Sequence, residues 1–330
     1  MNHSTFKSFT FGIGLFFTLP LVYGNSSSPS SSDGTLYINK SKTHKVAPVK
    51  YGFHYEEIGM MGEGALHAEL IRNRSFEEAT PPAGLSVKNG LYENVPAPRV
   101  KEKKVFQADP LIGWTTYPLS YTPVFISRTD ENPMSGENKY SMLVNVTEDI
   151  ANHSDALILN RGYYGMNLKT DTSYRLSLFL KNRNYSAPLR VFLVDEWGQR
   201  VSNVIEVNVG NRDWTKYTGE LKPEKNVRRG MFAIQPMSKG QFQMDVVSLF
   251  PSDTWNDGRS VFRKDIVQNL KEFSPSFIRF PGGCIVHGVN EETMYHWKKT
   301  LGPIENRPGQ WSKWAPYYRT DGIGYHEFYE

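Results

Sequence analysis

The segment that most constrains the fold is a short apolar strand that ends in a charged residue and breaks at once into Pro-Gly-Gly. It reads Phe277-Ile278-Arg279-Phe280-Pro281-Gly282-Gly283-Cys284. Glycines after a strand let another group approach the backbone closely, and α/β barrels build the floor of their sites from such strand ends at the C-terminal rim. The segment therefore predicts α/β structure with a site beside residues 279–284.

The residues before this strand carry a helical pattern. Phe262, Ile266, Leu270 and Phe273 are spaced by four, four and three, which predicts one apolar stripe on a helix over about 260–273. Earlier in the chain, residues 49–58 have the aromatic content of a strand, and glycines separate them from a helix-like turn at 65–71. Helix, strand and glycine-rich rim in succession are typical of an α/β barrel.

Residues 76–250 differ in texture, because they consist of short runs of β-branched and aromatic residues separated by Gly, Asn, Asp and Pro. Several runs alternate apolar and polar residues, as a strand with one buried face should. The pattern predicts an antiparallel sandwich or jelly roll inserted between two α/β pieces. The expected strands are 141–146, 174–180, 189–194, 204–209, 231–234 and 243–250.

The N-terminus predicts export to the periplasm or the extracellular space. Lys7 precedes an apolar run that ends in small residues at Gly24, which is the pattern of a secretory signal over residues 1–24. An uncleaved membrane anchor is the alternative. A Ser-, Pro- and Gly-rich tract then begins a linker over 25–45, which cannot bury enough apolar surface to order itself. The run is too short for a comfortable membrane span, so no span is expected after signal removal.

Composition excludes some functions. The 38 Lys and Arg are scattered among 34 Asp and Glu, so the net charge of +4 forms no basic stripe of the kind that nucleic acid needs. Cys284 is the one cysteine, so no intrachain disulfide is expected. The histidines lack metal-ligand spacing, and we expect neither a metal nor a cofactor.

Five segments together resemble, in order, the α-L-arabinofuranosidases of glycoside hydrolase family 51. The resemblance implies an incomplete (β/α)8 TIM barrel, at 46–75 and 255–330, with a β-sandwich or jelly roll inserted at 76–254. The inserted part is similar to galactose-binding-like carbohydrate-binding modules only in general pattern. The five segments are Gly52–Gly59, Ala68–Phe76, Ile278–Cys284, Trp297–Pro308 and Gly322–Phe328.

The resemblance also implies an activity: retaining hydrolysis of terminal non-reducing arabinofuranosyl residues in plant cell-wall arabinan, arabinoxylan or arabino-oligosaccharides. Such enzymes use an acid/base Glu and a nucleophile Glu about 5 to 5.5 Å apart. Both are expected beyond Glu330, so the chain is expected to be an N-terminal portion that is inactive alone. The pair Asn290-Glu291 follows the Pro-Gly-Gly loop too closely to end a later barrel strand. Hexamers occur in the family, so a homo-oligomer is left open.

The resemblance assigns substrate-binding roles at the rim. Glu56 matches the family's glutamate at the end of the first barrel strand, where a carboxylate accepts hydrogen bonds from furanose hydroxyls. Cys284 stands where some members carry an arabinose-binding Asn, although a thiol is a weaker partner than an amide. Gly283 is expected to contribute through its backbone, and Arg279 and Trp297 complete the predicted set.

Structural alternatives stand beside these roles. Glu56 could be a solvated or ion-paired acid, Arg279 could pair with an acid inside the barrel, and Glu57 could pair with Arg72 or Arg279. Trp297 could pack in a lid instead of stacking on a sugar. A cysteine hydrolase built on Cys284 with His287 as base lacks an orienting Asn or Asp.

The predicted sandwich also has two interpretations. Tyr163 and Tyr164 could stack on sugars, yet paired tyrosines between glycines also suit an ordinary turn. A structural role is favoured for a domain inserted this early in a barrel. A non-catalytic carbohydrate-binding protein is the alternative function for the whole chain.

Overall fold

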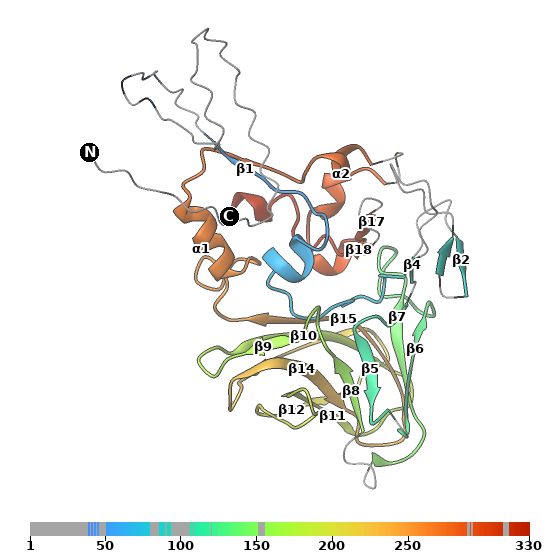
Figure 1. Cartoon of the computed structure of the whole chain (residues 1–330). Coiled ribbons are helices and arrows are strands. Elements are labelled where there is room, and N and C mark those ends of the chain that lie inside the picture. Colours follow the sequence, from blue (N-terminus) through green and yellow to red (C-terminus); the bar gives the residue numbers. More distant parts are fainter. Residues whose placement is uncertain are drawn as a thin grey trace, which may run out of the picture. The chain divides into compact units, whose positions relative to one another are not determined.

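The chain divides into two units, Met1–Ala47 and Pro48–Glu330, and a computed structural model of it is shown in Figure 1. The structure describes residues 39, 41, 43, 45, 51–79, 86–89, 91–93, 106–107, 109–119, 121–150, 156–288, 291, 293–312 and 317–330. In the first unit, the N–H of Ser41 donates to the side-chain oxygen of Asn39 at 3.0 Å. The predicted signal and most of the predicted linker lie outside the described residues. Within the described part, no helix is both long and apolar enough to cross a membrane.

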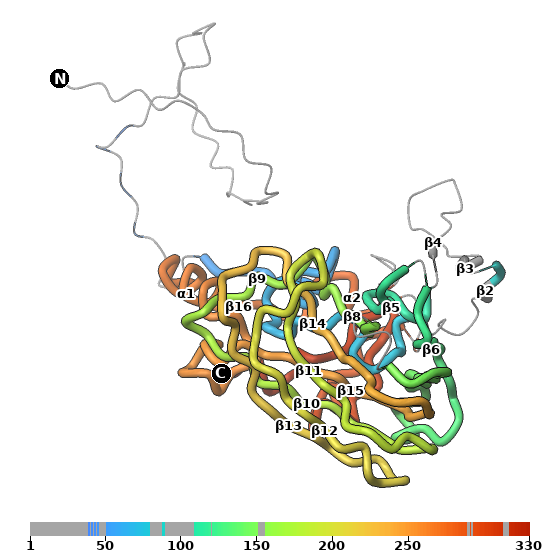
Figure 2. The backbone as a smooth tube through the Cα atoms, turned by 90° about the horizontal axis from the view of Figure 1, so that it is seen from below, coloured from blue at the N-terminus to red at the C-terminus, as the bar shows by residue number. Residues whose placement is uncertain are grey.

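Two antiparallel sheets dominate the second unit, and their strands can be followed in Figure 1. β10 and β13, which pair antiparallel, lie beside each other in Figure 2. The five-stranded sheet has the order β13 (Thr215–Leu221), β10 (Tyr174–Asn182), β15 (Gly240–Pro251), β7 (Ser141–Val146) and β6 (Val124–Thr129). The six-stranded sheet has the order β12 (Ile205–Asn208), β11 (Pro188–Val194), β14 (Val227–Gln235), β8 (Leu157–Asn160) and β5 (Trp114–Tyr117), with β9 (Met166–Leu168) also paired to β14.

The two sheets enclose one hydrophobic core. Along β10 burial alternates, so that Leu176, Leu178 and Leu180 are buried while Arg175 is exposed. From the other sheet, Val191 and the neighbouring apolar residues of β11 and β14 belong to the same buried cluster. Period-two alternation places every second side chain on one face of the sheet, which is why the alternation of apolar and polar residues in the sequence predicts these strands.

A smaller region contains a parallel strand pair. β1 (Phe53–His54) pairs in parallel with β16 (Ile278–Arg279), and α1 (Lys264–Glu272) precedes β16 along the chain. The remaining elements are short. They are η1 (Gly62–Leu66), β2 (Ser86–Lys88), β3 (Leu91–Glu93), β4 (Phe106–Gln107), α2 (Cys284–His287), η3 (Trp297–Thr300), η4 (Ile304–Asn306), β17 (Gln310–Ser312), β18 (Tyr317–Arg319) and η5 (Glu327–Tyr329).

The apolar stripe in the sequence predicted the position of helix α1, but the residues of the stripe are less buried than it indicated. The helix spans 264–272, within the predicted 260–273. Ile266 and Leu270 are only half-buried, and Phe273 is 61% exposed. The turn η1 lies at 62–66 instead of the predicted 65–71, because the chain is already extended at His67; within the turn, Glu63 and Gly64 depart from helical geometry.

The chain enters and leaves the two sheets at one place, which we call the neck and define as residues 69–76 and 247–250. The N–H of Leu70 donates to the carbonyl of Leu249 at 3.1 Å, and the N–H of Val247 donates to that of Arg74 at 2.9 Å. Buried Glu69 accepts from the N–H of Leu249 at 2.8 Å and from the Ser248 hydroxyl at 2.5 Å. The neck is therefore a short stretch of strand-like pairing fastened by a buried carboxylate.

Candidate functional site

Two adjacent strand ends bring Glu56 onto the Pro-Gly-Gly segment. Backbone pairing continues beyond β1, since the N–H of Tyr55 donates to the carbonyl of Arg279 at 2.8 Å. The Glu56 side chain lies so close to Gly282 that a Cβ there would be 2.5 Å from the Glu56 Cγ, and Gly282 also has a φ of +147°. The N–H of Ile285 donates to Glu56 Oε1 at 3.3 Å. The glycines thus make room for a half-buried carboxylate at the ends of these two strands. We call this group, Glu56 with Gly282, Gly283 and Cys284, the Glu56 rim.

The predicted neighbours of this carboxylate are in place. A Cβ on Gly283 would lie 3.1 Å from Glu56 Oε2 and 3.5 Å from His54 Cε1. Cys284 follows at the first position of α2, and its thiol is free and exposed. The structure therefore groups Glu56, Gly283 and Cys284, with His54 beside them. His287 directs its Nδ1 to the carbonyl of Gly288 at 2.7 Å.

Arg279 and Trp297 are placed differently. Arg279 is exposed, lies opposite His54 in register, and has no ion pair within the part of the chain that the structure describes, so its pairing with an interior acid stays a prediction. Trp297 is 44% exposed and packs against Tyr325 with ring centroids 5.1 Å apart. Tyr325 in turn lies 5.8 Å from Phe280, so Trp297 ends an aromatic cluster behind the strand.

Glu57 belongs to a buried polar group instead of an ion pair. It accepts hydrogen bonds from the hydroxyls of Tyr55, at 2.7 Å, and of Tyr317. The predicted pairing with Arg72 or Arg279 is wrong, and Arg72 pairs with Glu78 at 3.3 Å. Burial and the nearby charge of Glu63 raise the pKa of Glu57, and the two tyrosine hydrogen bonds oppose this.

Glu63 is the second buried carboxylate of this group. Its Oε1 accepts from the Thr320 hydroxyl at 2.6 Å and from the Thr320 N–H at 3.1 Å, and its Oε2 accepts from Tyr163 at 3.1 Å. His67 lies 3.7 Å away. Burial alone would raise its pKa, but His67, Thr320 and Arg74 outweigh burial and lower the pKa of Glu63 to about 2.

These carboxylates border a cavity of about 20 Å³ that is also lined by Arg319 and Asp321. Such a volume holds about one water molecule and no sugar ring. Arg319 Nε lies 2.9 Å from Asp321 Oδ1, and the guanidinium stacks over Tyr295 at 4.8 Å. Among the described residues, no cluster has the composition of a metal site. We therefore interpret this group as the rigid support beneath the Glu56 rim.

Sequence reasoning missed the support. Glu63 and Thr320 are 257 positions apart in the sequence, and Glu57 and Tyr317 are 260 positions apart. No local sequence pattern therefore joins either pair. One signal was present: Tyr317, Arg319 and Asp321 alternate at period two beside a family motif.

Comparison with known proteins is consistent with this arrangement. Residues 269–330 match the family model described as the alpha-L-arabinofuranosidase 1 domain. Alpha-L-arabinofuranosidase 1 of Arabidopsis thaliana is 28% identical over 85% of this chain and 38% of its own length. The extracellular exo-alpha-L-arabinofuranosidase of Streptomyces chartreusis is 27% identical over 84% of this chain and 30% of its own. The chain thus spans less than half the length of these relatives.

A solved structure is similar over most of the chain. The arabinose-bound α-L-arabinofuranosidase MgGH51 superposes with a TM-score of 0.71 at 26% identity, covering 88% of this chain and 43% of that one.

Proposed function

We infer that this chain, a relative of the α-L-arabinofuranosidases of glycoside hydrolase family 51, supplies the sugar-binding rim of an enzyme that releases arabinose. The reaction is retaining hydrolysis of terminal non-reducing α-L-arabinofuranosyl residues in arabinan or arabinoxylan. The observation that carries the proposal is the contact of Glu56, at the end of β1, with Gly282 and Gly283 after β16. Adjacent parallel strand ends are where barrel enzymes hold their substrates.

The proposal extends to the fold. β1, α1 and β16 are the first strand, a helix and the second strand of a (β/α)8 barrel at 46–75 and 255–330, interrupted by a β-sandwich at 76–254. The parallel register of β1 with β16 and the single core between the two antiparallel sheets support this. Export of the protein is part of the same proposal, and the extracellular relative from Streptomyces chartreusis supports it.

Each rim residue then has a role. The Glu56 carboxylate accepts hydrogen bonds from two furanose hydroxyls, and these bonds orient the terminal sugar. The backbone at Gly283 and the Cys284 thiol bound the opposite side. The acid/base and nucleophile glutamates, about 5 to 5.5 Å apart, belong to later barrel strands than β16. Glu57 and Glu63 receive no catalytic role, because tyrosine and threonine hydroxyls already occupy them.

The test is the hydrolysis of 4-nitrophenyl α-L-arabinofuranoside by the full-length protein. Loss of a charge-assisted hydrogen bond in Glu56→Gln should lower kcat/KM about 10- to 100-fold. Glu206→Gln, which changes an exposed carboxylate on β12, is the matched control and should retain wild-type activity. Equal activity of Glu56→Gln and the control would remove Glu56 from the site.

The alternative is a non-catalytic carbohydrate-binding protein. It predicts that the wild-type full-length protein releases no arabinose from branched arabinan, yet is retarded by that polysaccharide in affinity electrophoresis. Arabinose release that Glu56→Gln reduces would exclude it.

A further inference from the structure

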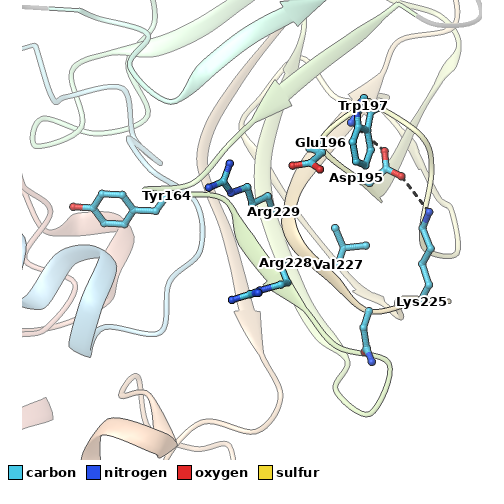
Figure 3. A pocket seen from close by; sticks show the side chains of 9 residues that line it. Tyr164, Asp195, Glu196, Trp197, Lys225, Val227, Arg228 and Arg229 are labelled. Atoms are coloured by element: carbon cyan, nitrogen blue, oxygen red, sulfur yellow. Dashed lines mark hydrogen bonds and ion pairs between the residues drawn. The ribbon is translucent and has the colours of Figure 1, made fainter.

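A second concave site lies on the six-stranded sheet, away from the Glu56 rim. Its volume is about 690 Å³, and nine residues line it. In the view of Figure 3, Tyr164 and Trp197 mark its two ends, with Arg228, Arg229 and Glu196 between them. Tyr164 is 78% exposed and Trp197 is 69% exposed. Two large aromatic faces open to solvent over one hollow indicate a ligand, because such surface is costly to leave exposed.

The Trp197 end is held in place by its turn. The carboxylate of Asp195 accepts from the N–H groups of Trp197, at 3.2 Å, and Gln199, at 2.9 Å, and the N–H of Gly198 donates back to the Asp195 carbonyl at 3.1 Å. Such a turn fixes the backbone beneath the indole. The Trp197 indole is therefore exposed on a turn whose backbone is fixed by hydrogen bonds.

The Tyr164 end is fixed by its neighbour. Gly162 and Gly165, with φ values of +62° and +88°, turn the chain so that adjacent tyrosines face opposite ways. Tyr163 is directed inward and donates to Glu63 at 3.1 Å, whereas Tyr164 is directed outward into the second site. Of the two adjacent tyrosines, only Tyr164 lines the second site, while the hydrogen bond of Tyr163 to Glu63 holds the turn in place.

A β-bulge supplies the middle of the site. On β14, Val227 pairs with Leu168 and Gly230 pairs with Met166, so three steps on one strand face two on the other. Bulges re-aim side chains that strict alternation would send to opposite faces. Here the extra residue lets consecutive Arg228 and Arg229 both line the hollow.

The positively charged residues of the second site differ in whether they form an ion pair. Lys225 is neutralised by Asp195 at 3.1 Å (Figure 3). Arg228 and Arg229 are exposed and have no ion pair within the described ranges. Guanidinium groups bind carboxylates in a planar, bidentate manner, and aromatic faces suit the apolar faces of sugar rings. The remaining carboxylate, Glu196, is suited to accept sugar hydroxyls.

We propose that this second site binds an acidic polysaccharide, in which sugar rings pack on Trp197 and Tyr164 and uronate carboxylates pair with Arg228 and Arg229. The site is independent of the arabinose-releasing function proposed above, since it shares no residue with the Glu56 rim. It would hold the protein on uronate-bearing chains.

The experiment is affinity electrophoresis of the intact protein in gels that contain glucuronoxylan, the same glucuronoxylan after reduction of its carboxyl groups, or neutral arabinoxylan. Glucuronoxylan is expected to retard the protein, and added salt to weaken the retardation, because the carboxylate contacts are exposed. The carboxyl-reduced polymer should bind at least about tenfold more weakly.

Variants separate the site from general charge. Arg228→Gln with Arg229→Gln, and Trp197→Ala, should each weaken binding about tenfold or more. Arg212→Gln and Phe125→Ala, which alter an exposed arginine and an exposed aromatic outside the hollow, are the matched controls and should bind as the wild type does. Thermal unfolding in the presence of glucuronoxylan oligosaccharides gives a second reading, because bound ligand raises the midpoint only where the site is intact.

Three results would overturn the proposal: equal retardation by the native and the carboxyl-reduced polymer, equal losses in Arg212→Gln and the Arg228 and Arg229 variants, or stronger retention by a single-stranded oligonucleotide than by glucuronoxylan. Loss of arabinofuranosidase activity in Glu56→Gln with unchanged retardation would show that the two sites stand or fall separately.

Discussion

At the scale of single residues, two neighbouring glutamates at one strand end have opposite environments. Glu56 is half-buried at the rim with one backbone donor, whereas Glu57 is buried with two tyrosine hydroxyls. Successive residues of an extended chain point to opposite sides, so the Glu56 carboxylate faces the glycine loop while the Glu57 carboxylate faces the interior.

The Tyr317 hydroxyl should matter most when Glu57 is ionised. Tyr317→Phe removes a donor from a buried carboxylate and should lower the free energy of unfolding by about 1 to 3 kcal/mol. Because the hydrogen bond favours the charged form, the loss should be larger at pH 8 than at pH 5. Urea unfolding at both pH values measures it, with Tyr121→Phe, whose hydroxyl contacts exposed Glu148, as the control. A loss independent of pH would contradict this account of Glu57.

Glu63 should make the fold sensitive to acid. Its folded-state pKa is depressed from 4.5 to about 2, so its stabilisation is fully present above pH 4.5 and is lost as the pH falls toward 2. The shift corresponds to about 3 kcal/mol. The free energy of unfolding of Glu63→Gln should therefore fall less than that of the wild type between pH 5 and pH 2.5. Exposed Glu206→Gln should follow the wild type, and parallel pH profiles for all three proteins would refute the assignment.

At the scale of elements, the loop from β16 to α2 depends on Gly282. A side chain there would meet Glu56 at 2.5 Å, and the φ of +147° is unfavourable for any residue with a Cβ. Gly282→Ala should cost about 1 to 3 kcal/mol of stability by thermal or urea unfolding. Gly136→Ala, where nothing lies within 4 Å, is the control. Equal unfolding of the two variants would show that the loop relaxes freely.

Strand positions were the part of the fold most accessible from sequence. The prediction of 141–146 matches β7, and β10, β11 and β15 are each found within a few residues, since alternation is written into the chain itself. The structure brings Glu56 beside Gly283, although the two belong to separate segments of the family resemblance, and their role in binding sugar stays a prediction. The support around Glu57 and Glu63 was not predicted, since its partners converge only through tertiary contacts. The bulge that places Arg228 beside Arg229 likewise depends on pairing with β9.

At the scale of the whole molecule, apolar side chains remain exposed around the parallel strand pair. Phe273, Phe277 and Ile278 are 61%, 51% and 52% exposed. Neighbouring exposed apolar residues of this kind favour association. The sheet region, by contrast, buries a large cluster of apolar residues between its two sheets.

The chain should therefore self-associate through this region. Sedimentation velocity of these 330 residues should show larger species as concentration rises, and Phe273→Ser with Ile278→Thr should reduce them. Phe125→Ser, at an exposed position on β6, is the control. A wild-type chain that stays monomeric at every concentration would contradict the expectation.

The neck has a topological consequence. Because Leu70 and Leu249 are joined by a backbone hydrogen bond, the chain departs into the two sheets and returns to a point about one strand spacing, roughly 4.8 Å, away. The intervening residues form a side branch whose two ends almost touch. A deletion, insertion or exchange of the sequence between these two points would therefore leave the order of the remaining elements unchanged, because a short linker could rejoin the two ends.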